Sequence, residues 1–313
     1  MNKFVLAVVG LAFCSAVVIA DAPAWSDLRG SFLILKDESF AQFPRTIDDA
    51  EAGGYTAVSS TPNDCSNGGL FNGIQYTKTN DYSVGLLYDI GGVIAGLQML
   101  IPHNTVLNEN STLRYGDIPM YNNVTYNDVV YFILTTYFVN PSTICSRGRT
   151  ETELEQDGTG SGVWIQNGTS AAASVQIPLS RPVATSKGWT ENNCFPAMGY
   201  HNFYMLDQYS RTNCQLMQPI FGLYNADDEL HGFGLITPGN IDNPRFEHPP
   251  DTAIKMILGS DKTPQCVIDL EQRIGITSLH VYFIPRPYLW TCSVTRTIGN
   301  YFQTARNWLS NIG

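Results

Sequence analysis

Short aromatic and β-branched segments, separated by Gly, Pro and Asn, run through most of this chain and constrain its fold more than any other feature. Such segments are typical of β-strands, and the residues between them are typical of turns. Only 15% of the residues are charged, so long amphipathic helices with charged outer faces would lack enough Lys, Glu and Arg. Strands are expected at Ser31–Lys36, Tyr55–Ser59, Gly73–Thr77, Ser83–Tyr88, Val93–Ile101, Val129–Val139, Gly162–Gln166, Ser174–Pro178, Tyr200–Met205, Ile220–Tyr224, Leu230–Ile236 and Leu279–Ile284. The pattern predicts a mainly β fold, with antiparallel sheets in one large or two related lobes.

The chain opens with Lys3 and an unbroken apolar run from Phe4 to Ala20, which ends in small residues. This pattern is typical of a secretory signal peptide, and we expect residues 1–20 to be removed after Ala20. The next most apolar segment, Val129–Val139, is too short to cross a bilayer as a helix. The expected mature protein is secreted, extracellular and soluble, with no membrane contact.

The chain is acidic, with 18 Lys and Arg residues against 28 Asp and Glu residues and a formal net charge of −10. Nucleic acids are bound through clustered basic residues that neutralise phosphates. The charge therefore excludes nucleic acid as a partner. It permits calcium or cationic partners, although solubility is its ordinary consequence.

Six cysteines follow the signal peptide, and an even number in an exported chain predicts three disulfides. They are Cys65, Cys145, Cys194, Cys214, Cys266 and Cys292. Closeness in sequence favours the pairs Cys194–Cys214 and Cys266–Cys292. No two cysteines have the CxxC spacing, so neither a thiolate zinc site nor a thioredoxin-like motif is supported. Three sequons, at Asn110, Asn123 and Asn167, predict glycosylation on surface loops.

Two segments share a spacing that suggests related lobes. Tyr88–Pro102 and Tyr224–Pro238 align without a gap on their Tyr, Gly and Pro residues, and each is typical of a hairpin. We expect an amino-terminal β-rich lobe over 21–148, a polar loop or linker over 149–162, and a carboxyl-terminal β-rich lobe over 163–313. The last lobe ends in an amphipathic helix, because apolar residues recur at helical spacing from Ile298 to Leu309. The alternative is that any two Gly-rich hairpins look alike.

The chain has no HExxH, GxSxG, Walker A or EF-hand pattern, so any chemistry must come from residues that the fold gathers. Histidine is the natural candidate, because its ring can act as base, acid or metal ligand near neutral pH. We expect His201, His231 and His280 on neighbouring strands around one pocket. Tyr282 shares a strand face with His280. Two further candidates, Glu247 and His248, lie in an extended segment. The alternative is that each histidine has only a structural role, with its ring hydrogen-bonded in the core or at its edge.

Five short blocks in the carboxyl-terminal half carry a family resemblance. They are Cys194–His201 (CFPAMGYH), Pro219–Asn225, Gly232–Gly234, Arg245–Pro249 and Leu279–Phe283, with Cys292 after them. This set resembles a group of secreted proteins of marine invertebrates that has no settled chemistry. In length, export signal and lack of enzyme motifs, the chain is also similar to the secreted luciferases of syllid worms. The second resemblance implies oxygen-dependent oxidation of a small luciferin in an aromatic, water-poor pocket.

The leading hypothesis is a secreted oxidoreductase of the oxygenase or luciferase type that acts on a small organic substrate. His201 or His280 would be the base, Tyr282 would orient the substrate, and His231, His248 and Glu247 would line the pocket. The cofactor would be nothing beyond oxygen, or else a transition metal or calcium. Two alternatives stay open: an acidic, calcium-binding extracellular matrix or biomineral-associated protein, and a carrier of small hydrophobic ligands. All three depend on whether the imidazoles meet in one cavity.

Overall fold

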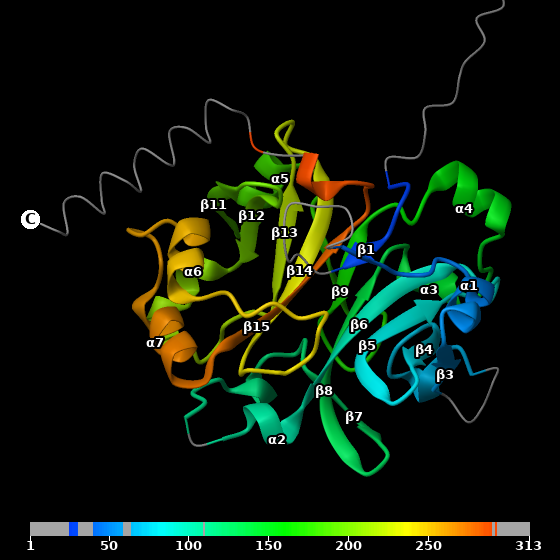
Figure 1. Cartoon of the computed structure of the whole chain (residues 1–313), viewed down its shortest axis with the longest axis horizontal. Helices are drawn as coiled ribbons and strands as arrows, with labels where there is room; N and C mark the ends of the chain where they lie inside the picture. The colour runs from blue at the N-terminus through cyan, green and yellow to red at the C-terminus, as the bar shows by residue number, and fades with distance from the viewer. Residues whose placement is uncertain (1–24, 31–39, 59–63, 109, 290–291, 293–313) are drawn as a thin grey trace, which may run out of the picture.

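The computed structural model describes residues 25–30, 40–58, 64–108, 110–289 and 292 (Figure 1). The expected signal peptide at 1–20, the strand at Ser31–Lys36 and the carboxyl-terminal helix lie outside the described residues. Within the described residues, no helix is both long enough and apolar enough to cross a membrane.

Two antiparallel sheets make up most of the structure, so the prediction of a mainly β, antiparallel fold is confirmed (Figure 1). The seven-stranded carboxyl-terminal sheet has the order β11 (Trp189–Phe195), β12 (Gly199–Tyr204), β13 (Ile220–Tyr224), β14 (Leu230–Pro238), β15 (Ile276–Tyr282), β1 (Arg29–Gly30) and β2 (Ala41–Gln42). The eight-stranded amino-terminal sheet has the order β10 (Ser174–Ile177), β9 (Val163–Gln166), β8 (Val129–Tyr137), β6 (Ile94–Pro102), β5 (Asp81–Tyr88), β4 (Ile74–Lys78) and β3 (Tyr55–Ala57), and β7 (Asn122–Tyr126) pairs with β8.

Four of these strands, β1, β2, β7 and β11, were not expected from the sequence, and β7 and β11 are the longer two. β11 contains Glu191 and two asparagines, which have low strand propensity, but it pairs with β12 and buries Trp189. β7 pairs with β8 across a tight turn at Asn127 and Asp128, both of which have positive φ. Such turns favour Asn and Asp because both central residues are left-handed. Tertiary pairing therefore creates strands where local propensity is weak.

The strand pairing crosses the expected lobe boundaries. β1 comes from the amino-terminal part of the chain but pairs with β15 in the carboxyl-terminal sheet. Conversely, β9 and β10 lie after residue 162 but belong to the amino-terminal sheet, because β9 pairs with β8. Each sheet is thus completed by strands from the other half of the sequence.

The segment 149–162, expected as a polar loop or linker, contains helix α4 (Glu151–Asp157). A capping box between Thr150 and Glu153 begins this helix. Arg149 is anchored on the buried Asp89 carboxylate, with an Nε to Oδ2 distance of 3.2 Å. Part of the segment expected as a polar loop or linker is therefore helical, and its first residue is anchored on the amino-terminal sheet.

The two hairpins with similar spacing have the same strand register. In β5 and β6, Leu87 pairs with Gly96, and a bulge follows before Tyr88. In β13 and β14, Leu223 pairs with Gly232, and a bulge follows before Tyr224. The next strand continues the match, because Gly96 faces Tyr137 of β8 and Gly232 faces Tyr282 of β15.

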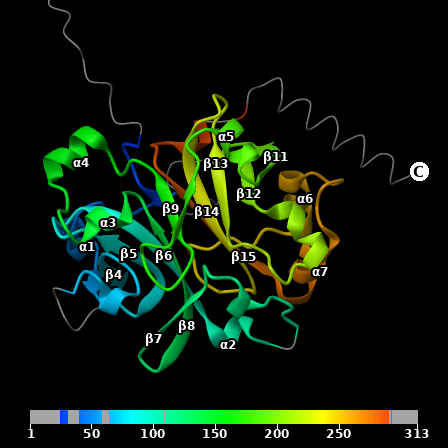
Figure 2. The ribbon, with the colours of Figure 1, turned by 180° about the vertical axis from the view of Figure 1, so that it is seen from behind.

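One hydrophobic core joins the sheets, which lie side by side in both views (Figure 2). Phe138, just after β8, contacts Phe283, just after β15, with ring centroids 5.1 Å apart. Trp25 stacks on the same Phe283 ring at 4.2 Å. Phe138 and Phe283 each follow the matching strand of their own sheet. Their contact in the shared core therefore fixes the position of one sheet against the other.

Short helices cover the sheet edges and faces. They are α1 (Ile47–Ala52), α2 (His103–Val106), α3 (Pro141–Ile144), α5 (Arg181–Ser186), α6 (Asp251–Leu258) and α7 (Gln265–Ile274). Helices α6 and α7 lie beside the carboxyl-terminal sheet (Figure 1) and were not expected from the sequence. Each follows a proline and ends at a glycine with positive φ, Gly259 and Gly275. This bracket stops a helix at both ends.

The three disulfides join Cys65 to Cys145, Cys194 to Cys292, and Cys214 to Cys266. The expected pairs Cys194–Cys214 and Cys266–Cys292 are therefore wrong. Closeness in sequence misled because β12 carries the chain away from Cys194, whereas the end of the described chain returns to it, bringing the Cα atoms of Cys194 and Cys292 within 5.7 Å. Three intramolecular disulfides fit a secreted protein.

The matched register makes a testable prediction about two glycines. A Cβ added to Gly96 would overlap the Thr136 carbonyl oxygen, and one added to Gly232 would overlap the Val281 carbonyl oxygen. We expect Gly96→Ala and Gly232→Ala each to lower the free energy of unfolding by about 1–3 kcal/mol, measured by urea denaturation. Gly116→Ala is the control, because its Cβ would meet nothing within 4 Å. If one of the two substitutions lowers the stability and the other does not, then Gly96 and Gly232 do not occupy equivalent positions.

Candidate functional site

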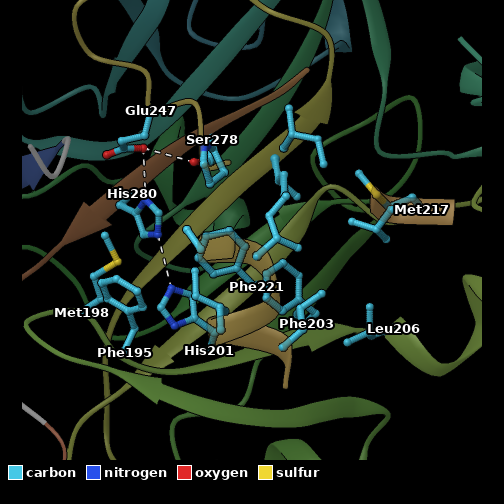
Figure 3. A pocket seen from close by; sticks show the side chains of 18 of the residues that line it. Phe195, Met198, His201, Phe203, Leu206, Met217, Phe221, Glu247, Ser278 and His280 are labelled. Atoms are coloured by element: carbon cyan, nitrogen blue, oxygen red, sulfur yellow. Dashed lines mark hydrogen bonds and ion pairs between the residues drawn. The ribbon is translucent and has the colours of Figure 1, made fainter. Parts of the chain in front are cut away.

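A cavity of about 180 Å³ lies between the carboxyl-terminal sheet and helices α6 and α7 (Figure 3). Its walls are mostly apolar and aromatic, and they include Phe195, Phe203, Phe221, Leu206 and Met217. Polar side chains gather at one end, where Figure 3 shows a row of interactions that runs from Ser278 to Glu247, then to His280 and to His201. The cavity is thus apolar with a single polar end, which is the usual form of a site for a small organic molecule.

The strand register places the polar end. His201 and Phe203 alternate onto one face of β12, and Ser278 and His280 alternate onto the same face of β15. Gly234 of β14 lies opposite His280 and also opposite Phe221. A Cβ on Gly234 would overlap the Phe221 ring. This glycine therefore lets the ring lie within 5.3 Å of the His201 ring and 5.1 Å of the His280 ring, centroid to centroid.

The two histidines face each other through the same nitrogen. His201 Nε2 is 3.4 Å from His280 Nε2. On their far sides, His201 Nδ1 is 3.2 Å from the Gly199 carbonyl oxygen, and His280 Nδ1 is 3.1 Å from Glu247 Oε2. A carbonyl oxygen only accepts hydrogen bonds, so His201 carries its proton on Nδ1. A carboxylate likewise orients the Nδ1–H of His280.

Glu247 is held by the strand beside it. Its backbone N–H donates to the Ser278 carbonyl and its own carbonyl accepts from the Ser278 N–H, both at 2.9 Å. The Ser278 hydroxyl also donates to Glu247 Oε2 at 3.3 Å. The carboxylate is therefore fixed against His280 by an isolated β-bridge, although it lies outside the regular sheet.

Burial keeps His201 neutral. The side chain is fully buried, and this burial, with smaller contributions from His280 and His231, holds the pKa of His201 well below its usual value. A neutral imidazole protonated on Nδ1 presents a lone pair on Nε2. That lone pair is directed at His280.

His231 does not join this pair. It is buried elsewhere on the sheet, with Nε2 3.1 Å from the Met198 carbonyl oxygen, and it does not line the cavity. The expectation that three strand histidines surround one pocket is therefore wrong for His231. His248 is exposed at the rim of the cavity, with Nδ1 3.4 Å from the Thr277 hydroxyl.

Tyr282 lies behind His280, with ring centroids 6.3 Å apart, and does not line the cavity. Its buried hydroxyl has no hydrogen-bond partner among the described residues. Burial, and then the Glu247 charge, hold the pKa of Tyr282 well above its usual value, so the hydroxyl stays protonated. A role in orienting a substrate directly, as expected from the sequence, does not fit this position.

The helical wall of the cavity was missed from the sequence. Helix α6 contributes Ala253, Ile254 and Ile257, and α7 contributes Val267. The Pro–Gly brackets around these two helices were the signal that could have revealed them.

The sequons lie as expected at Asn110 and Asn123, which are exposed, whereas Asn167 is half-buried. Among the residues that the structure describes, no three His, Cys, Asp or Glu side chains gather as a metal cluster.

The buried His231 predicts a pH-dependent stability. Burial lowers the pKa of His231 to about 4, so between about pH 4 and 6.5 only the unfolded chain binds a proton at this residue. The free energy of unfolding should fall as the pH drops through that window, by up to about 3 kcal/mol from this group. His231→Gln, whose amide can reach the Met198 carbonyl, should flatten the curve measured by urea denaturation. If the free energy of unfolding falls equally with pH in the wild type and in His231→Gln, then His231 is not a source of the pH dependence.

Comparison with known proteins adds no relative. No family model matches the chain, and neither the curated proteins nor the solved structures yield a match.

Proposed function

We propose that the protein binds a small aromatic molecule with one polar substituent in the cavity under helices α6 and α7. The observation that carries this proposal is the cavity itself, about 180 Å³ in volume, apolar on its walls and polar at one end. An engineered apolar cavity of about 150 Å³ accommodates benzene. A single substituted ring is therefore the size of ligand that the space favours.

The polar end supports one hydrogen-bonding substituent and not several. Ser278, Glu247 and His280 are adjacent there, whereas the opposite wall is formed by Leu206 and Met217. A phenol matches this division, because its ring is apolar and its hydroxyl both donates and accepts. Binding without turnover would make the protein an extracellular carrier of such compounds.

A second candidate function keeps the oxygenase or luciferase hypothesis, and the Glu247–His280 hydrogen bond favours it. A carboxylate on Nδ1 fixes the tautomer and the orientation of the ring, so that Nε2 carries the lone pair, as in other carboxylate–histidine pairs. In this reaction His280 removes a proton from an activated C–H bond of the substrate. The carbanion gives its electron pair to dioxygen and forms a C–O bond, and the stored proton completes a hydroperoxide.

The calcium-binding matrix alternative has less support among the described residues. Asp228 pairs with Arg181 at 2.6 Å and Asp89 pairs with Arg149 at 3.2 Å, so these acidic turn residues already have cationic partners. The Glu153 carboxylate accepts from Thr150 and Arg147. The acidic groups thus stabilise local structure.

Binding is tested with p-cresol by isothermal titration calorimetry, with toluene as the ligand that lacks the hydroxyl. We expect p-cresol to bind more tightly than toluene. Ala253→Phe should abolish binding of both, because residue 253 lines the cavity from α6. Thr252→Ala, an exposed neighbour that does not line the cavity, is the control. Binding that survives Ala253→Phe in a folded protein would place the ligand elsewhere.

Turnover separates the two candidates. Oxygen uptake is measured with an electrode during incubation with phenolic compounds, and the compounds are then recovered and analysed. Unchanged recovery supports the carrier. Uptake that is lost in His280→Gln, while the melting temperature stays within a few degrees, supports the oxygenase. Uptake that persists in His280→Gln would remove His280 as the base.

A further inference from the structure

We propose that His201 and His280 form a two-histidine binding site for a zinc-like divalent transition-metal ion, with its remaining coordination positions open to the cavity. The observation is the face-to-face placement of two imidazole Nε2 atoms 3.4 Å apart, at the polar end of the cavity (Figure 3). This inference is independent of the proposed ligand, because it rests on the two rings and their own hydrogen bonds.

Both Nδ1 atoms are already engaged with oxygen acceptors. The Gly199 carbonyl takes the Nδ1–H of His201, and the Glu247 carboxylate takes that of His280. The two Nε2 atoms, each left with a lone pair, then lie next to each other. Two buried acceptors in contact are unfavourable unless an electrophile lies between them, and a proton and a metal ion are the two electrophiles available.

The distance favours the metal ion. Histidine nitrogens bind zinc at about 2.0–2.1 Å, so two of them around a tetrahedral ion lie about 3.3–3.4 Å apart. Hydrogen bonds donated by N–H groups are most often about 2.7–3.2 Å long. The observed 3.4 Å matches the first spacing and is at the long end of hydrogen-bond range.

The partners behind the rings are those that metal sites use. Histidine ligands commonly donate their second N–H to a carboxylate or a backbone carbonyl, which fixes the tautomer and orients the ring. Glu247 and Gly199 supply one of each. The Glu247 carboxylate also offsets part of the positive charge that an ion would bring into this apolar surrounding.

The protein supplies only part of the coordination shell. Among the residues described, no third His, Cys, Asp or Glu forms a metal-binding group with the two histidines. Water, hydroxide or a ligand oxygen must therefore complete the coordination shell. Such an open site binds an ion less tightly than a closed structural site does, and it leaves room for a bound molecule. A bound ion and a proton-accepting role of His280 exclude each other, because both use the same lone pair.

The experiment titrates the intact, chelator-treated protein with Co²⁺, followed by visible absorbance, and with Zn²⁺ by calorimetry. We expect one ion per chain, a cobalt spectrum of four-coordinate type, and displacement of Co²⁺ by Zn²⁺. His201→Gln and His280→Gln should each weaken binding at least about tenfold, and Glu247→Gln by about tenfold or more. His201→Gln is expected to fold, because the matching position of the other sheet is Gln75: Gln75 pairs with Leu87 as His201 pairs with Leu223.

His248→Gln is the matched control, because it removes an imidazole from the rim of the same cavity. Its affinity for the ion should equal that of the wild type. The proposal is overturned if no equimolar binding occurs, if binding survives loss of His201 or His280, or if His248→Gln abolishes it. In the wild type, p-cresol binding without cobalt binding would defeat the metal site alone, and cobalt binding without p-cresol binding would defeat the proposed ligand alone.

Discussion

The pairing of β14 with β15 is the interaction on which the rest of the structure depends. Seven residue pairs, from Gly232 with Tyr282 to Pro238 with Ile276, join the two strands without a bulge. β15 is also the strand on which β1 docks, and its end carries Phe283 into the core between the sheets. The same register sets His280 opposite Gly234, which leaves room for the Phe221 ring beside both histidines. A slip of one residue would turn His280 to the other face of the sheet.

The two sheets match in register but differ at the site. In the amino-terminal sheet, Gln75 and Thr135 occupy the register positions that His201 and His280 occupy in the other, and Gln98 lies between them and bonds to both, at 2.6 and 3.1 Å. There, Gly85 faces Gln98, whereas in the carboxyl-terminal sheet Phe221 faces Gly234. The large side chain thus lies on β6 in one sheet and on β13, the strand that matches β5, in the other. The amide network is satisfied within itself, but the histidine pair has no polar side chain between its two rings.

Much of the fold follows from local pattern, and much of the site does not. The alternating segment Leu279–Phe283 was recognisable as a strand because period-two alternation is a local property. The convergence of His201 and His280 depended on both being strand residues of one sheet, which the sequence only suggested. The pairing of Cys194 with Cys292, and the place of Glu247 beside His280, depend on contacts across long stretches of chain. No local pattern contains that information, so nearest-neighbour reasoning about the cysteines was wrong.

The wall of the cavity is held without help from a ligand. Cys266 lies in the first turn of α7 and is bonded to Cys214, so the helix that closes the cavity is covalently tied to the segment between β12 and β13. A wall fixed in this way costs little further ordering when a molecule enters. Both histidines are buried beneath this wall, and a low-dielectric surrounding makes an unsatisfied lone pair more unfavourable than it would be in bulk water. The disulfide that fixes α7 thus shapes the apolar cavity and also helps to bury the two histidines, which makes the polar end of the cavity favour an electrophile.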